Sequence, residues 1–143
     1  MSQEGVDLET SVGYLLKEAS SALRTAMEAT LRPLGMTVTH YSCLELLAQR
    51  PGLSNSELAR GTFVSRQSMN VLLQSLERAG EVTRPTEAPV GKVLPTRLTD
   101  LGRERHALAS AAVREVERQM LAALTPEDRS ETRRLLRSLI ASL

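Results

Sequence analysis

The sequence is poor in several residue types: it has one cysteine, no tryptophan and three aromatic residues among 143. The single cysteine, Cys43, excludes an intramolecular disulfide bond. No charged and apolar leader opens the sequence, and no apolar run approaches the roughly 18 residues of a membrane-spanning helix. We therefore expect a cytoplasmic protein without membrane contact. Because aromatic side chains are so few, aliphatic ones must fill the core, and the abundance of leucine favours a mainly helical fold.

The sequence also lacks an excess of positive or negative charge, since its formal net charge at pH 7 is +1. Its distribution is more informative. Residues 60–99 carry six basic and three acidic side chains, whereas residues 1–49 carry three basic and six acidic ones. A mildly positive central segment suits local binding to phosphate, although ordinary surface scatter gives the same counts. A chain of this length holds one domain, so we treat residues 1–143 as a single unit.

Apolar residues recur every three or four positions in most of the chain, which predicts amphipathic helices. Start and stop residues give their expected ranges: 11–31, 37–50, 54–60, 65–78, 99–124 and 125–143. In the third helix, Ser54 and Glu57 form a capping box and Gly61 is expected to end the helix. Residues 81–99 instead contain short stretches of alternating apolar and polar residues, separated by proline and glycine. This pattern predicts a two-stranded hairpin with Pro95 on an edge strand.

Two short helices joined by residues 61–64, the second polar on its outer face, have the arrangement of a helix-turn-helix. A DNA major groove admits one helix, so base-reading side chains must lie in the first two turns after Ser65. The following hairpin would supply a wing for phosphates or the minor groove. The predicted DNA-binding residues are polar side chains of this unit: Ser54, Asn55, Thr62, Ser65, Arg66, Gln67, Ser68, Asn70, Gln74, Arg84, Lys92 and Arg97. A merely solvated helix face is the alternative, which the agreement of successive elements disfavours.

Four stretches of this chain together resemble the MarR family of transcriptional regulators. They are LSNSELA at 53–59, VSRQSMN at 64–70, LERAG at 76–80 and LTDLG at 98–102, and the resemblance spans residues 11–143. It implies a mainly α fold with a small β-hairpin wing. In that fold, residues 11–36 and 100–143 form an intertwined dimerisation region, and residues 37–99 form a DNA-binding winged helix-turn-helix.

The resemblance also implies a mode of action. A homodimer would bind double-stranded DNA at a pseudo-palindromic operator, as a repressor released by a small aromatic or phenolic effector. The family's wing tip usually carries an Asp-Arg-Arg cluster, where this sequence has Val90, Gly91 and Lys92. We therefore expect wing contacts to be weaker, or to pass through Arg84 or Arg97.

The first and the last two predicted helices have apolar stripes too long for one small domain to cover. Burial against a second copy explains them, with folding back on the same domain as the alternative. A single recognition helix would also read too few bases for useful selectivity. Both considerations favour a homodimer.

Three side chains are candidates for holding an effector. Tyr41 is suited to stacking on or bonding a phenolic acid, and His40 or Arg24 to pairing with its charge. The alternative places Tyr41 in the core and His40 on the surface. Cys43 is a second candidate for regulation, as an oxidant sensor, but beside Leu44 on an apolar helix it is more readily a buried core residue.

Catalysis is not expected from this composition. Two histidines and one cysteine offer no metal-ligand spacing, no glycine-rich phosphate loop is present, and nothing orients Cys43 and His40 as a catalytic pair. We expect no enzyme activity, no metal and no cofactor. The altered wing tip leaves one further alternative, a winged helix that binds protein instead of DNA.

Overall fold

The computed structural model describes residues 5–86 and 94–143. Its elements are α1 (Val12–Leu31), η1 (Arg32–Leu34), α2 (Val38–Gln49), α3 (Asn55–Thr62), α4 (Arg66–Arg78), β1 (Val82–Thr83), β2 (Arg97–Leu98), α5 (Asp100–Met120) and α6 (Pro126–Ala141). Most described residues are helical, and β1 and β2 pair as a small antiparallel hairpin. The predicted fold class is confirmed. Val90, Gly91 and Lys92 lie outside the described residues.

Each α-helix begins after a hydroxyl side chain that accepts a hydrogen bond from an amide of the first turn. These capping residues are Ser11, Thr37, Ser54, Ser65, Thr99 and Thr125. The caps satisfy amides that the helix itself leaves without partners. The predicted capping box at Ser54 is complete. Local sequence therefore fixes where each helix starts.

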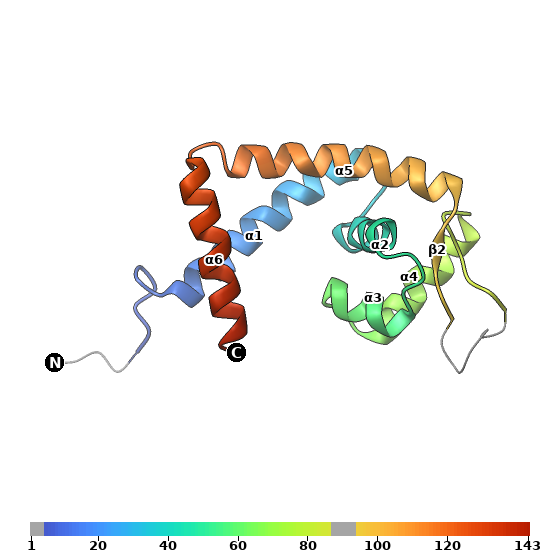
Figure 1. The fold of residues 1–143 in the computed structure, drawn as a ribbon, viewed down its shortest axis with the longest axis horizontal. Coiled ribbons are helices and arrows are strands. Elements are labelled where there is room, and N and C mark those ends of the chain that lie inside the picture. The colour runs from blue at the N-terminus through green and yellow to red at the C-terminus, as the bar shows by residue number, and fades with distance from the viewer. Residues whose placement is uncertain (1–4, 87–93) are drawn as a thin grey trace.

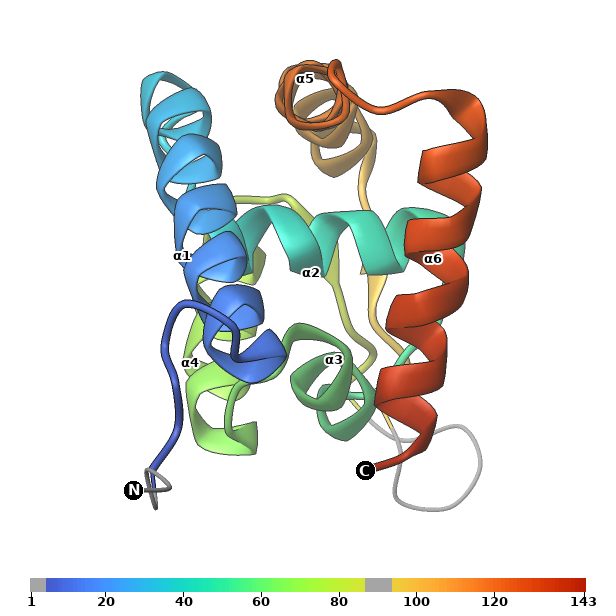
Figure 2. The ribbon, with the colours of Figure 1, turned by 90° about the vertical axis from the view of Figure 1, so that its left-hand side faces the viewer.

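Figure 1 shows two regions of different character. Residues 37–86 and 94–99, with α2, α3, α4 and the hairpin, form what we call the lobe. Residues 12–26 and 107–143, which include most of α1, the second half of α5 and all of α6, form what we call the arm. Helix α5 starts at the lobe and runs into the arm, and Figures 1 and 2 together show α6 standing apart from the lobe.

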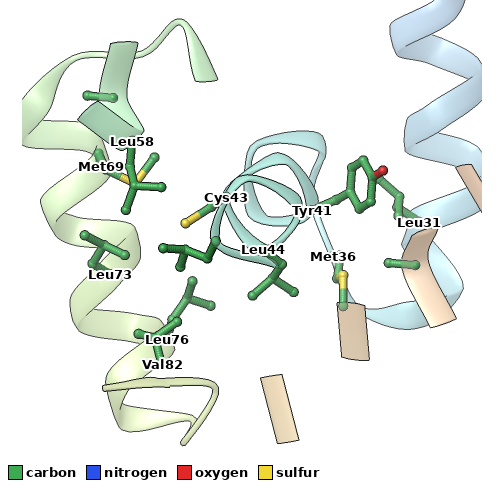
Figure 3. Close-up of a cluster of buried hydrophobic side chains, with 13 residues drawn as sticks. Leu31, Met36, Tyr41, Cys43, Leu44, Leu58, Met69, Leu73, Leu76 and Val82 are labelled. Atoms are coloured by element: carbon green, nitrogen blue, oxygen red, sulfur yellow. The ribbon is translucent and has the colours of Figure 1, made fainter. Parts of the chain in front are cut away.

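The core of the lobe lies between α2 and α4. Its fully buried side chains are contributed by three helices: Cys43, Leu44, Leu47, Leu58, Met69 and Leu73. Figure 3 shows Cys43 directed toward α4, whereas the ring of Tyr41 leaves the other side of α2 toward Leu31 of α1. Each fully buried leucine contributes about 2 kcal/mol through removal of apolar surface from water. One face of α4 therefore packs in this core, and the opposite face is exposed to solvent.

The hairpin is shorter than predicted and has an additional partner. Val82 pairs with Leu98 and Thr83 with Arg97, and an isolated bridge joins Leu53 to Thr96. Leu53 directly precedes the Ser54 cap of α3, so this bridge fastens the base of the hairpin to the start of α3. Among the described residues, the paired strands are two residues each, shorter than the alternation within residues 81–99 predicts.

Gly61 does not end α3, contrary to the prediction. The helix runs through Gly61 to Thr62, and Phe63 follows in the left-handed conformation. A Cβ at Gly61 would lie 2.6 Å from the Leu46 Cδ1 atom. A side chain at this position would have to displace the Leu46 side chain, so Gly61 marks a close approach of α3 to α2 and not the end of the helix.

Helix α5 is joined rigidly to the lobe at its first turn. The amide of Thr99 donates to the Glu81 carbonyl oxygen at 3.0 Å, and the Thr99 hydroxyl donates to the Gly80 carbonyl at 2.5 Å. A Cβ at Gly102 would lie 2.1 Å from the Glu81 carbonyl oxygen, so only glycine permits this approach. The far end of α5 is at Met120, four residues before the predicted Leu124.

The arm leaves its apolar stripes uncovered. On α5, Val116 is buried but Leu108 and Met120 are exposed, and four apolar side chains of α6 are exposed as well. Those α6 residues are Leu135, Leu136, Leu139 and Ile140. The single chain does not cover these α6 side chains, so their predicted burial requires a second copy. Within residues 5–86 and 94–143, no helix is long and apolar enough to cross a membrane.

Candidate nucleic-acid interface

Three of the predicted site residues hold α3 and α4 in place. The Ser54 hydroxyl accepts from the Glu57 amide at 3.2 Å, as the cap of α3. The Asn55 side-chain amide donates to the Arg66 carbonyl at 3.2 Å, which ties the start of α3 to the start of α4. The Thr62 hydroxyl donates to the Leu58 carbonyl at 2.7 Å. Asn55 therefore joins the two helices, whereas Ser54 and Thr62 stabilise α3 itself.

The outer face of α4 presents polar side chains in its first turns. Arg66, Gln67 and Gln74 are exposed and Asn70 is half-buried, while Met69 and Leu73 are buried on the other side. None of the hydrogen bonds among the described residues uses the side chains of those four polar residues. The capping hydroxyl of Ser65 also donates to the Ser68 hydroxyl at 3.0 Å. Guanidinium and carboxamide groups projecting from one helix face can form paired hydrogen bonds with base edges.

The basic residues of the hairpin differ in their surroundings. Arg84 is held by Glu77 of α4, whose Oε1 atom lies 2.9 Å from Nε and 2.5 Å from a terminal nitrogen of the guanidinium. Arg97 is exposed and lies beside Gly52. The predicted contact residue Lys92 lies outside the described residues. Arg97 is therefore the basic hairpin residue that the described structure presents to solvent.

A cavity of about 550 Å³ lies where α1 passes α2 and the turn between α3 and α4. It is lined by apolar, hydroxyl and cationic groups: Ser20, Leu23, Arg24, Met27, Val38, Thr39, Ser42, Gly61, Thr62, Phe63 and Val64. Arg24 is the one charged residue in this lining, and its Nε donates to Glu28 at 3.1 Å. A cavity of this composition suits a small ligand with an apolar body and an anionic group.

Two of the three residues predicted to bind an effector lie elsewhere. His40 Nε2 is 3.0 Å from Glu81 Oε1, and Arg105 of α5 donates to the same oxygen at 3.2 Å. The Tyr41 hydroxyl donates to Glu45 Oε1 at 3.0 Å, and burial together with this bond raises the pKa of Tyr41 to about 12. Both side chains thus belong to polar networks at the junction of α2 with α5, and Arg24 alone lines the cavity.

A second network at that junction was missed by sequence reasoning. His106 and Ser110 of α5 both bond to the Glu45 carboxylate of α2. Burial raises the pKa of Glu45, but the hydrogen bonds from His106 and Tyr41 outweigh it, and the net pKa is lowered. The two histidines of the chain therefore both connect the lobe to α5 through a glutamate. No local pattern signals these pairs, because their members are 41 and 61 residues apart.

Cys43 is completely buried in the core between α2 and α4. Burial, with a smaller effect of the Glu81 charge, raises the pKa of its thiol to about 12. The thiol is therefore neutral near pH 7 and inaccessible, whereas an oxidant sensor needs an exposed thiolate. The structure supports the core interpretation of Cys43.

Helix, turn, outward-facing helix and adjacent hairpin together define the lobe as a winged helix-turn-helix. Comparison with known proteins gives the family. A protein-family model described as MarR family matches residues 34–92. The HTH-type transcriptional repressor Rv2887 of Mycobacterium tuberculosis is 42% identical over 135 residues, which cover 94% of this chain and 97% of that protein. The chain belongs to the MarR family.

Solved structures agree with this assignment. Rv2887 in complex with salicylic acid has a TM-score of 0.74 and 42% identity, covering 91% of this chain and 96% of that one. Rv2887 in complex with DNA has a TM-score of 0.75 and 41% identity, covering 91% and 98%. The Staphylococcus aureus MepR–DNA complex, at 20% identity, shares the fold with a TM-score of 0.81 over 95% of this chain and 99% of that one.

Proposed function

We propose that this chain is a dimeric repressor that binds a pseudo-palindromic operator through α4 and is released by a small aromatic acid. The observation that carries the proposal is the division of α4 into two faces. Met69, Leu73 and Leu76 anchor one face in the core, so Arg66 and Gln67 are held on the other by a rigid support. Relatives that resemble the chain over most of its length include a repressor solved with DNA and with salicylic acid.

The chemistry of α4 assigns roles to its side chains. Arg66 is suited to guanine, because its guanidinium can donate to O6 and N7 together, and Gln67 or Asn70 to adenine. Ser65, Ser68, Arg97 and Lys92 would contact phosphates and fix the register. Asn55 would act indirectly, by positioning α4, and Ser54 and Thr62 by stabilising α3. Because Arg84 is already paired with Glu77, we give it a smaller role than Arg97.

The arm supports the dimer in this proposal. Exposed leucines on α1 and α6 would be buried against a second copy, which fits residues 11–36 and 100–143 as the dimerisation region and 37–99 as the DNA-binding region. Two copies would place two α4 helices on successive half-sites of one DNA face. A regulator of this kind acts by binding and not by catalysis, in the cytoplasm where its operator is found.

The DNA-binding test compares two arginines on the same helix. Arg66→Ala is expected to weaken operator binding by about 10- to 100-fold and to relax base preference at one position of each half-site. Arg78→Ala, at the far end of α4, serves as the matched control and should change affinity by less than about threefold. Wild-type affinity should fall steeply as salt is raised. Salt-independent binding with no operator preference would favour the alternative, a winged helix that contacts protein.

The effector test uses salicylate and the cavity that Arg24 lines. Salicylate should raise the melting temperature of the wild-type protein and dissociate the operator complex. Arg24→Gln should weaken salicylate binding by about 10-fold or more, through loss of a charged hydrogen bond. Arg32→Gln, an exposed arginine just after α1, is the control. If salicylate changes neither the melting temperature nor the operator complex, release by this class of ligand is refuted.

A further inference from the structure

Among residues 5–86 and 94–143, Glu81 is the one charged residue that is buried, with 5% of its surface exposed. It lies between α4 and β1, directly after Gly80, the left-handed residue that follows the end of α4. Burial of a carboxylate is costly unless hydrogen bonds and opposite charges compensate for the lost water. The bonds around Glu81 therefore indicate what its burial achieves.

The backbone of Glu81 connects α4 to α5. Its amide donates to the Leu76 carbonyl oxygen at 2.9 Å, a bond that closes the last turn of α4 around the left-handed Gly80. Its carbonyl oxygen accepts from the amide of Thr99, the capping residue of α5, at 3.0 Å. Both bonds therefore oppose a change in the position of α5 relative to the end of α4.

The side chain of Glu81 adds α2 and η1 to this connection. Its Oε1 atom lies 3.0 Å from Nε2 of His40 in α2 and 3.2 Å from Nε of Arg105 in α5. A terminal nitrogen of Arg105 also donates to the Leu34 carbonyl oxygen of η1 at 2.8 Å. The Arg105 side chain is only 31% exposed, so water screens its pair with Glu81 less than it screens a surface ion pair.

This connection matters for the function proposed above, because a dimer must present its two α4 helices at a distance that matches two half-sites. One base pair inserted between the half-sites moves one of them by about 3.4 Å along the duplex and rotates it by about 35°. A dimer whose lobes are rigidly joined to α5 binds one spacing well. A dimer whose lobes are loosely joined accepts several.

We propose that Glu81 and Arg105 are positioning residues that determine which half-site spacing the dimer accepts. Neither residue reads bases: both act by fixing α4 relative to α5, which continues into the arm. The inference rests on the proposed dimeric repressor and deepens it, because it separates selection of the spacing from selection of the bases, which we assign to Arg66 and its neighbours on α4.

The experiment measures affinity for duplexes that differ only in spacing. The probes are a duplex that the wild-type chain selects from a random library and two versions with one base pair added or removed between its half-sites. The wild-type dimer should bind each altered version at least about 10-fold more weakly. Glu81→Ala and Arg105→Met should each reduce this spacing penalty to less than about threefold, while binding the selected duplex about 3- to 10-fold more weakly than the wild-type chain does.

Two glutamate variants serve as controls. Glu81→Gln retains an oxygen that can accept from both His40 and Arg105, so its spacing penalty should stay close to that of the wild-type chain. Glu77→Ala removes a carboxylate whose partner, Arg84, lies within the lobe, so it should leave the spacing penalty unchanged.

A purely structural role predicts a different result. If Glu81→Ala and Arg105→Met only lowered stability, they would weaken binding to all three duplexes equally, and an intact spacing penalty in both overturns the inference. Arg105→Met, on a partly exposed side chain, decides the question if Glu81→Ala does not fold. A wild-type chain without a spacing penalty also overturns the inference. A selected duplex without two related half-sites instead refutes the proposed dimeric binding itself, which is a different result.

Discussion

The lobe and the arm contain the same kind of side chain in opposite situations. Leu44, Leu58 and Leu73 of the lobe are completely buried, whereas Leu136 of α6 is 38% exposed and Ile140 is 73% exposed. Both sets recur at helical spacing, so sequence periodicity does not distinguish them. Periodicity shows that a face will be buried, but not what will cover it.

The comparison also explains how the regions would cooperate. The lobe is fastened to α5 by the Thr99 and Gly102 joint and by the two histidine–glutamate networks, so we expect a change in the orientation of α5 to carry the lobe with it. In the proposed dimer, whatever sets the angle between two α5 helices also sets the distance between two α4 helices. A ligand between α1 and the turn before α4 lies where it would alter that geometry.

We expect the largest effect from introducing negative charge on the apolar face of α6 in the arm. Leu136→Glu with Leu139→Glu places two carboxylates on the stripe that we assign to the second copy. We expect a monomer and a loss of operator affinity of about 100-fold or more, because each lobe then binds its half-site alone. Light scattering after gel filtration and a DNA titration measure the two quantities. Ser130→Glu, on the polar side of α6, is the control, and a dimer surviving the double substitution would contradict the assignment.

Truncating one leucine in each region is the second comparison. Leu73→Ala should lower the free energy of unfolding by about 2–5 kcal/mol, because it opens a cavity in a closed core. Leu139→Ala should cost far less at protein concentrations where the chain is monomeric, and more where it is dimeric. Urea denaturation at two protein concentrations measures both. Equal losses at both concentrations for Leu139→Ala would mean that α6 is not at an interface.

Whether a feature depends on local or on distant contacts decides how well the sequence predicts it. Thr37, Ser54, Ser65 and Thr125 mark helix starts correctly, because a cap bonds to an amide only three residues away. The polar outer face of α4 was predicted for the same reason, since its spacing is a property of one helix. These local signals were sufficient for the fold class and for the DNA-binding unit.

Features that depend on distant residues have no local signal in the sequence. Gly61 reads as a stop signal, but α3 continues through it, and Leu46 of α2 lies close to it. His40 and Tyr41 look like ligand-binding groups at a helix start, yet Glu81 and Glu45 engage them in the networks toward α5. The bridge between Leu53 and Thr96 has no signal in either segment alone. Tertiary packing, not local pattern, determines each of these.

The third comparison uses two glycine-to-alanine substitutions that we expect to change stability in opposite directions. At Gly102 a Cβ would lie 2.1 Å from the Glu81 carbonyl oxygen, so we expect Gly102→Ala to lower stability by about 1–3 kcal/mol despite its better helix propensity. At Gly13 of α1 the nearest atom is the Ser11 hydroxyl oxygen at 3.8 Å, so Gly13→Ala should raise stability by up to about 1 kcal/mol. Thermal unfolding of the two variants measures the difference. A stable Gly102→Ala protein would mean that the joint between α5 and the lobe is not rigid.

The smallest expected effect is on stability at acid pH, and it compares Glu45 with Glu115. The pKa of Glu45 is lowered by its bonds to His106 and Tyr41, although burial opposes the shift, and the pKa of Glu115 in the arm is lowered by its bond to Arg118. A lowered pKa adds stability above the ordinary value near 4.5, and this contribution is lost as pH falls through the folded-state pKa. Glu45→Gln should therefore flatten the fall in melting temperature between about pH 5 and pH 3. Glu115→Gln should leave that fall unchanged, because solvent screens an exposed pair. If the two variants follow the same acid profile, the Glu45 network does not stabilise the junction between lobe and arm.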